Sequence, residues 1–248
     1  MTQIPSYLEY RIRRSIPPNL NVVAGSTPVV SFGDAHVAKT ATLGLNPSHI
    51  EFLGPDGREL VGSSRRLATH RSLRTDDLAN APASAITQVL SDCYTYFRRN
   101  PYRRWFGQLE SILNACGDSY YAGSACHLDL VQWATDPTWG SLRPAKLRNQ
   151  LLHTDAPFLI EQLSTENIQL LLVNGMSVLR RLQRLFDTTL HEVDPIIGLG
   201  HQNTRLFVGE ILHGMRVIAW STNLQSSFGV TRELRSEIAN RVARFSGR

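Results

Sequence analysis

The feature that most constrains the fold is a short apolar run that leads directly into an amphipathic helix. Residues 168–173 read Ile-Gln-Leu-Leu-Leu-Val, which is typical of a strand buried on both faces. Asn174-Gly175 interrupts the run, and apolar residues then recur at helical spacing at Val178, Leu179, Leu182 and Leu185. A strand, a tight turn and a helix form the repeating unit of α/β proteins.

Strands and helices alternate in the first half of the chain as well. Strands are expected at residues 29–32, 41–45 and 125–131, and helices at 85–97 and 105–113. Such alternation predicts an α/β fold, a three-layer α/β/α sandwich with a mainly parallel central sheet.

The second half continues this alternation. Pro144 fits the first turn of a helix ending near His153, and another helix is expected at 156–163. Two apolar segments flank His213-Gly214 and predict a β-hairpin: residues 205–212 and 215–220. Thr231 is expected to cap a final helix.

The domain organisation is expected to be simple. The chain has 248 residues, 42% of them hydrophobic, which is enough to bury a sizeable core. No repeat, low-complexity block or long linker interrupts it. We expect an N-terminal arm over 1–20, closed by Pro17-Pro18, and one domain over 21–248.

The sequence gives no sign of a membrane segment, a metal site or a cofactor. No apolar run approaches the roughly 18 residues that a membrane helix needs, and charged residues interrupt the first 14 positions, so a soluble, cytoplasmic monomer is expected. The three cysteines form no Cys-x-x-Cys pair, and the eight histidines form no metal-binding motif.

The basic residues are almost all arginine. Lys and Arg total 26 against 21 acidic residues, and Lys39 and Lys146 are the only lysines, which leaves 24 arginines (26 − 2). Arginine binds phosphate in a bidentate manner and stacks on bases, so nucleic acid is a natural partner. A compositional bias towards arginine explains the count equally well.

In α/β sheets the ligand site lies beyond the carboxyl ends of the strands, which draws attention to residues 44–48 and 127–131. Asn46 could orient a water molecule but not deprotonate it, and Glu51 is the nearby carboxylate that could act as a base. A turn in which Asn46 bonds its own backbone is the alternative.

Two further segments suit nucleic acid. The loop at 221–227 offers hydroxyl and amide groups to phosphate, through Ser221, Asn223, Ser226 and Ser227. Residues 100–106 interleave aromatic and basic side chains: Tyr102, Trp105 and Phe106 would stack a base while Arg103 and Arg104 neutralise the backbone. An ordinary strand-to-helix connection and core packing are the respective alternatives.

The order of these motifs resembles the uracil-DNA glycosylase superfamily. Residues 44–48, Gly-Leu-Asn-Pro-Ser, are similar to the first motif of its mismatch-specific and single-strand-selective branches, and residues 171–177 are similar to its apolar strand and glycine turn. The resemblance spans about Val29 to Val242. It implies a uracil-DNA glycosylase-like fold and hydrolysis of the N-glycosidic bond of a damaged or deaminated base flipped from DNA, as in base excision repair.

That resemblance also assigns roles. Asn46 would position water, Asp129 would read the base edge, and Ser48 with residues 221–227 would bind phosphate. The late loop, however, lacks the His-Pro-Ser sequence usual in the family, so no histidine there can stabilise the departing base. A catalytically weak module that binds nucleic acid or a nucleotide is therefore the alternative function.

Overall fold

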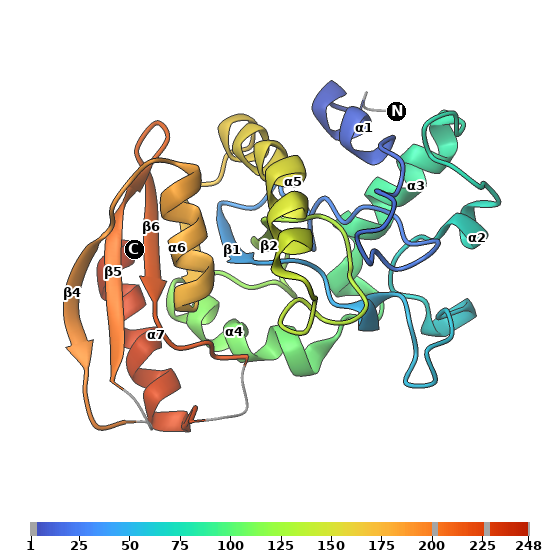
Figure 1. Cartoon of the computed structure of the whole chain (residues 1–248). Helices are drawn as coiled ribbons and strands as arrows, with labels where there is room; N and C mark the ends of the chain where they lie inside the picture. Colours follow the sequence, from blue (N-terminus) through green and yellow to red (C-terminus); the bar gives the residue numbers. More distant parts are fainter. Residues whose placement is uncertain (1–3, 200–202, 226–228, 248) are drawn as a thin grey trace. The chain divides into compact units, whose positions relative to one another are not determined.

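The computed structural model describes residues 4–199, 203–225 and 229–247. The chain divides into two compact units (Figure 1). Unit 1 consists of Met1–Asp34, Leu45–Pro101 and Leu128–Thr165, and unit 2 consists of Ala35–Gly44, Tyr102–His127 and Glu166–Arg248. The chain thus returns to each unit repeatedly instead of completing one before starting the other. The expectation of a single domain over 21–248 stays a prediction.

Unit 2 is built around a six-stranded sheet with the order β2-β1-β3-β6-β5-β4. The strands are β1 (Thr40–Gly44), β2 (Ala125–Asp129), β3 (Leu170–Asn174), β4 (His191–Ile196), β5 (Thr204–Ile211) and β6 (Met215–Trp220). Strands β1, β3 and β6 are parallel, whereas β5 pairs antiparallel with both β6 and β4. The α/β class is confirmed, and the sheet is mixed, with parallel strands at its centre.

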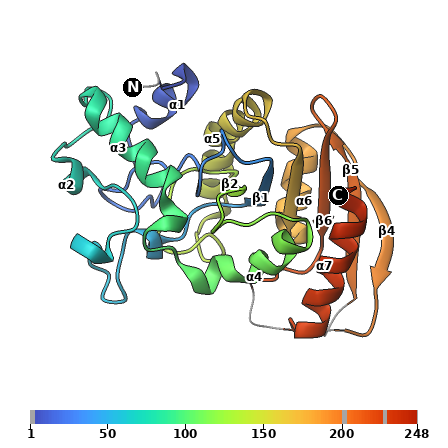
Figure 2. The same ribbon diagram turned by 180° about the vertical axis from the view of Figure 1, so that it is seen from behind.

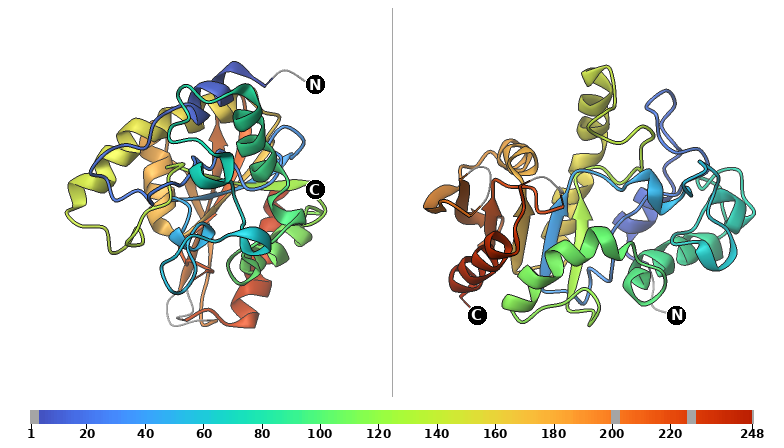
Figure 3. Two further views of the ribbon diagram at one scale, coloured as in Figure 1. Left: turned by 90° about the vertical axis from the view of Figure 1, so that its right-hand side faces the viewer. Right: turned by 90° about the horizontal axis from the view of Figure 1, so that it is seen from below.

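Helices cover both faces of this sheet. Helix α6 (Met176–Leu185) contacts β3 and β6 on one face, and α7 (Arg232–Ser246) contacts β4 and β6 on the other (Figures 2 and 3). Helix α4 (Arg103–Ala115) packs against α7. Unit 2 therefore has the three layers that the sequence predicts.

The β3–α6 connection forms as expected from local signals. All five residues of β3 are buried, and α6 begins directly after Gly175, whose φ of +96° is in the region that favours glycine. The predicted hairpin is confirmed as β5 and β6, and Thr231 caps α7 by accepting a hydrogen bond from the amide of Leu234.

Unit 1 contains helices and long connections. Its elements are α1 (Ser6–Ile12), η1 (His49–Glu51), η2 (Gly62–Ser64), α2 (His70–Leu73), α3 (Ala83–Tyr94), η3 (Tyr96–Arg98) and α5 (Ala145–Thr165), with the end of β2. One of its core clusters comprises Leu20, Val131, Trp133, Trp139, Leu142 and Leu151.

Two sequence predictions in unit 1 are wrong. Residues 29–32 do not form a strand. They run extended and buried, and the Val29 amide donates to the Gln132 carbonyl at 2.8 Å. The two helices expected at 144–153 and 156–163 are one helix, α5, which continues through Pro157. Ala156 and Phe158 are buried on either side of this proline, so tertiary packing overrides the helix-breaking tendency.

The expected N-terminal arm contains a helix that packs into unit 1. Arg11 of α1 is 1% exposed, and its Nη2 lies 3.1 Å from Oδ2 of Asp155 on α5. Arg11 Nε donates to Gln132, and its guanidinium carbon lies 5.0 Å from the centre of the Trp133 ring. Burial lowers the pKa of Arg11 to about 10 and raises the pKa of Asp155, because removal from water opposes both charges. The attraction between the two charges offsets only part of this desolvation, and the pair joins α1 to α5.

We expect Asp155→Ala to lower the free energy of unfolding by about 3–5 kcal/mol, because it leaves a buried guanidinium without its counter-charge. The double substitution Arg11→Met/Asp155→Leu should lose much less, since neither charge is then buried alone. Urea unfolding checks both. The partly exposed pair Glu9–Arg13 is the control, and Glu9→Gln should cost less than about 1 kcal/mol. Equal losses for the single and double variants would contradict this account.

Candidate active site

Asn46 lies on the segment that follows β1, and hydrogen bonds fix its amide. The Leu45 carbonyl accepts from the Val131 amide at 3.0 Å, which brings this segment beside the one that follows β2. The Asn46 Nδ2 donates to the carbonyl of Pro47 at 3.0 Å, which is the local turn bond expected as the alternative role of this residue. It also lies within hydrogen-bond distance of the carbonyl of Trp133, at 3.2 Å, and of Oγ1 of Thr135, at 3.1 Å. Among the described residues nothing donates to Asn46 Oδ1, so this oxygen is oriented and left available to a water molecule.

Ser48 and His49 follow in the same loop. Ser48 caps η1 by accepting from the Ile50 amide at 3.4 Å, which is the role the structure describes for its hydroxyl. His49 Nδ1 is buried and has no hydrogen-bond partner within residues 4–199, 203–225 and 229–247. His49 lies three residues after Asn46 in the sequence. The sequence did not predict a role for it, because a single histidine forms no recognisable motif.

Glu51 is a buried carboxyl whose pKa is raised. Its side chain is 2% exposed, and the Tyr96 hydroxyl donates to Oε2 at 2.6 Å. Burial raises the pKa of Glu51 to about 7, the hydrogen bond from Tyr96 and the charge of Arg66 oppose the rise, and the charge of Asp129 adds to it. A carboxyl with a pKa near neutrality holds or releases a proton readily at physiological pH, as general acid–base catalysis requires.

Asp129 ends β2 and belongs to the same unit as Asn46 and Glu51. It is 5% exposed, and its backbone carbonyl accepts from Nε2 of Gln132 at 2.7 Å, which fixes the turn after the strand. The charge of Asp129 contributes to the raised pKa of Glu51. Unit 1 therefore holds four of the predicted site residues: Asn46, Ser48 and Glu51 after β1, and Asp129 at the end of β2.

The predicted aromatic and basic residues belong to the start of α4 in unit 2. Trp105 is 37% exposed, and Arg103 lies over the Tyr121 ring, 4.4 Å from its centre. Phe106 is instead a core residue. It is 1% exposed, and its ring edge packs against Tyr120 and His127. Helical periodicity explains the difference, because adjacent helix positions point about 100° apart.

In the late loop, the predicted phosphate-binding side chains have structural roles. Ser221 Oγ accepts from the Arg205 amide at 3.0 Å. Asn223 Oδ1 accepts from Asn174 Nδ2 at 2.8 Å and from the Gln225 amide at 3.0 Å. Ser226 and Ser227 lie outside the described residues. Phosphate binding by this loop stays a prediction.

Asn174, at the end of β3, organises that loop. Its Oδ1 accepts from Trp220 Nε1 at 2.8 Å and from the Leu224 amide at 2.9 Å, while its Nδ2 donates to Asn223 and, at 3.1 Å, to Oε1 of Gln225. Both ends of the amide are thus used. Sequence reasoning treated Asn174 only as a turn residue, although a polar residue ending an apolar strand was the available signal.

A pocket of about 450 Å³ lies in unit 2, next to this loop. Its lining residues come from the start of α4, from the late loop and from α7 with the residues before it: Tyr102, Arg104, Trp105, Gln108, Leu224, Gln225, Val230 and Arg235. None of these residues is acidic. The structure thus brings three of the predicted nucleic-acid-binding residues together with three other polar or charged residues, Gln108, Gln225 and Arg235.

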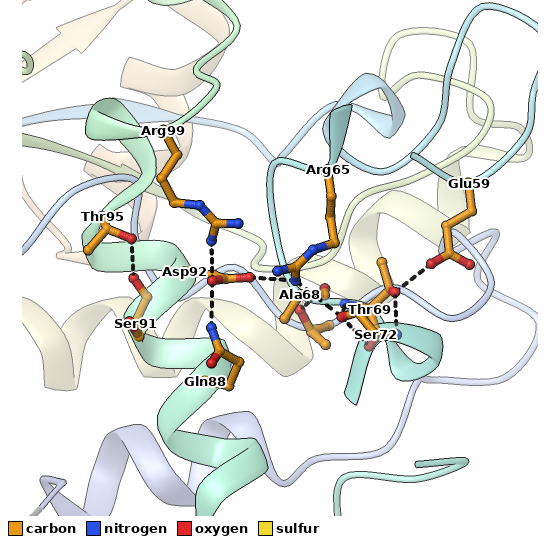
Figure 4. Close-up of polar contacts among 11 residues, drawn as sticks. Glu59, Arg65, Ala68, Thr69, Ser72, Gln88, Ser91, Asp92, Thr95 and Arg99 are labelled. Carbon is orange, nitrogen blue, oxygen red and sulfur yellow. Dashed lines mark hydrogen bonds and ion pairs between the residues drawn. The ribbon is translucent and has the colours of Figure 1, made fainter. Parts of the chain in front are cut away.

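Other arginines of the sequence are engaged elsewhere. Arg65 and Arg99 both pair with Asp92 on α3, which is 1% exposed and also accepts from Nε2 of Gln88 at 2.8 Å (Figure 4). Two guanidinium groups therefore compensate one buried carboxylate and join the segment around residue 65 to α3. These internal ion pairs account for the positions of Arg65 and Arg99, so no phosphate ligand is needed to explain them.

Comparison with protein-family models gives no match, and comparison with curated proteins gives none at a significant level. Within the described residues, no group of three or more His, Cys, Asp or Glu side chains is arranged to hold a metal ion. No helix in the described part of the chain has the length and apolar character needed to cross a bilayer.

The raised pKa of Glu51 predicts a pH dependence of stability. The folded state keeps this proton up to about pH 7, whereas the unfolded chain releases it near pH 4.5, so stability is greatest at low pH and falls as the pH rises through this window. Glu51→Gln should abolish this loss, which amounts to about 3 kcal/mol. The glutamine oxygen can still accept from Tyr96.

Urea unfolding at about pH 5 and about pH 8 measures the effect. Wild type should lose stability relative to Glu51→Gln between these values, whereas Glu161→Gln, an exposed position on α5, should follow wild type. Parallel pH profiles for wild type and Glu51→Gln would show that Glu51 ionises at its ordinary pKa.

Proposed function

We propose that this chain is a divergent member of the uracil-DNA glycosylase superfamily and hydrolyses the N-glycosidic bond of a damaged or deaminated base flipped out of DNA. The observation that carries the proposal is Glu51, a buried carboxyl with its pKa raised to about 7, five residues beyond the oriented amide of Asn46. An oriented hydrogen-bond acceptor and a poised base are the two groups that activation of water needs.

The proposed reaction assigns one task to each group. The N-glycosidic bond breaks with its electron pair passing to the base nitrogen, which leaves an oxocarbenium-like sugar. Asn46 Oδ1 accepts one hydrogen of a water molecule and aims its oxygen at the anomeric carbon. As the new C–O bond forms, the Glu51 carboxylate accepts the other proton. Because the sugar is already cationic, a weakly basic carboxylate is sufficient.

Asp129 is proposed to read the base. A carboxylate offers acceptors only, so it favours a base that presents an amino or imino proton and disfavours the carbonyl oxygens of uracil. Stacking by Tyr102 and Trp105 and contacts from Arg103 and Arg104 to a nucleic-acid backbone are proposed for unit 2 by itself.

The second candidate function is a binding module without catalytic activity. The pocket of unit 2 favours it, because aromatic and basic side chains line that pocket while the sequence of the late loop contains no histidine to stabilise a leaving base. Binding would then involve nucleic acid or a nucleotide, with no change to the ligand.

Cleavage assays on variants separate these functions. Oligonucleotides carrying uracil, hypoxanthine, xanthine or an alkylated base are incubated with the protein, and abasic sites are revealed by alkaline strand scission. Asn46→Ala and Glu51→Gln should each lower the cleavage rate by at least about 100-fold, because both groups act on the transition state, and should leave binding nearly intact.

Matched controls on α5 are Asn149→Ala and Glu161→Gln, which change the same residue types at exposed positions and should cleave like wild type. If Glu51→Gln cleaves normally, Glu51 is not the base. If no substrate gives abasic sites while nucleic acid is still bound, the binding-module function stands instead.

Base preference provides a separate test. Asp129→Asn replaces an acceptor-only group with one that also donates, and it should shift the ratio of cleavage rates towards uracil over an alkylated adenine, which keeps an exocyclic amino group. The comparison is made as kcat/KM on otherwise identical oligonucleotides. Efficient uracil removal by the wild-type protein, with no change of preference in Asp129→Asn, would contradict the assignment of Asp129.

A further inference from the structure

We propose that the pocket of unit 2 lined by Tyr102, Trp105, Gln225 and Arg235 is a binding site for a phosphorylated nucleoside, either free or at the end of a strand. Its volume of about 450 Å³ lies within the roughly 300–1,000 Å³ typical of small-molecule sites. The proposal concerns binding in unit 2 and does not depend on cleavage at Asn46 and Glu51.

The charge of the pocket selects an anion. Arg104 and Arg235 supply two guanidinium groups, and no lining residue is acidic. Neither arginine forms an ion pair with a described residue, and Arg235 Nε is buried without a hydrogen-bond partner in the described part of the chain. A guanidinium group without a counter-charge suits a phosphate, which it can bind in a bidentate manner.

The aromatic side chains select a planar ring. Trp105 is one of the few large hydrophobic residues with substantial exposure in the described part of the chain, and Tyr102 lines the same pocket. Exposure of an indole face beside two guanidinium groups is the combination used to stack a base next to its phosphate.

The amide groups are held in place before any ligand binds. Gln225 Oε1 accepts from Asn174 and its Nε2 donates to the Trp105 carbonyl at 3.5 Å, which leaves one N–H of this amide for a ligand. Gln108 Nε2 donates to the Arg104 carbonyl at 3.2 Å, and this leaves its oxygen as an acceptor. A donor and an acceptor beside a stacking surface match the polar edge of a base.

Intrinsic fluorescence offers a local probe of this site. The chain has four tryptophans, and Trp133, Trp139 and Trp220 are at most 8% exposed, so quenching by a small ligand reports mainly on Trp105. Full-length protein is titrated with AMP, adenosine, UMP and uridine, and calorimetry gives the dissociation constants independently of the fluorophore.

AMP and UMP should quench the fluorescence and bind more tightly than their nucleosides. Trp105→Ala should weaken AMP binding at least about fivefold through loss of stacking. Arg235→Gln should weaken AMP while leaving adenosine unchanged. Arg232→Gln, an exposed arginine of the same helix that does not line the pocket, should match wild type.

A 5′-phosphorylated oligonucleotide and its unphosphorylated counterpart distinguish the sources of the ligand. Competition between AMP and the phosphorylated end supports one shared site for both.

The inference is overturned if AMP fails to bind at millimolar concentration, if Arg232→Gln and Arg235→Gln lose equal affinity, or if only internal stretches of a strand bind. Thermal denaturation confirms that each variant is folded. If the protein cleaves damaged oligonucleotides but does not bind AMP, only the binding site in unit 2 is contradicted. If it binds AMP but cleaves no substrate, only the proposed glycosylase reaction is contradicted.

Discussion

Buried polar groups need partners, and this constraint organises both units more than any single apolar contact. Asn174 ends a fully buried strand, so its amide takes four partners from the loop and strand of β6 and thereby fixes the course of residues 223–225. Asn46 lies two residues after β1, and its Nδ2 is satisfied in part by the segment after β2. In each case a strand-end amide converts a flexible connection into a defined surface.

The carboxyls of unit 1 follow the same rule with different outcomes. Asp92 and Asp155 each lie against two guanidinium groups. Among the described residues Glu51 accepts one side-chain hydrogen bond, from the Tyr96 hydroxyl, and burial raises its pKa to about 7, with the charge of Asp129 adding to the rise. Structural carboxylates in this unit are paired with arginine, and the one placed beside the Asn46 loop is poised to exchange a proton.

Local sequence signals predicted the elements that depend on local physics. The β3–Gly175–α6 unit, the β5–β6 hairpin and the Thr231 cap follow from apolar spacing, glycine geometry and side-chain capping, and all three are confirmed. The continuity of α5 through Pro157 depends on tertiary burial, and α1 depends on a counter-charge 144 positions away in the chain. No sequence window contains that information.

The site residues also fall into those that local sequence predicted and those that depend on tertiary packing. Strand-end logic found Asn46 and Asp129, since both follow apolar strands. The position of strand ends did not predict Tyr96, Gln108 or Arg235. Tyr96 contacts Glu51, 45 positions away in the chain, and Gln108 and Arg235 line one pocket only because α4 and α7 pack together. The spacing of α4 decides between Trp105 and Phe106, one exposed and one buried, and a pattern of aromatic and basic residues without a helix register could not separate them.

The order of strands in the sheet also has a consequence for how the chain folds during synthesis. Strand β1 is made early, but its neighbours in the sheet are β2 and β3, and Thr40 pairs with Leu170, 130 positions later (170 − 40). Closing so long a loop costs entropy before any ladder hydrogen bond forms, which slows folding. A nascent chain therefore carries β1, a strand that is buried in the folded protein, without its sheet partners until more than half of the polypeptide has emerged, and its unpaired backbone groups are open to other chains during that interval.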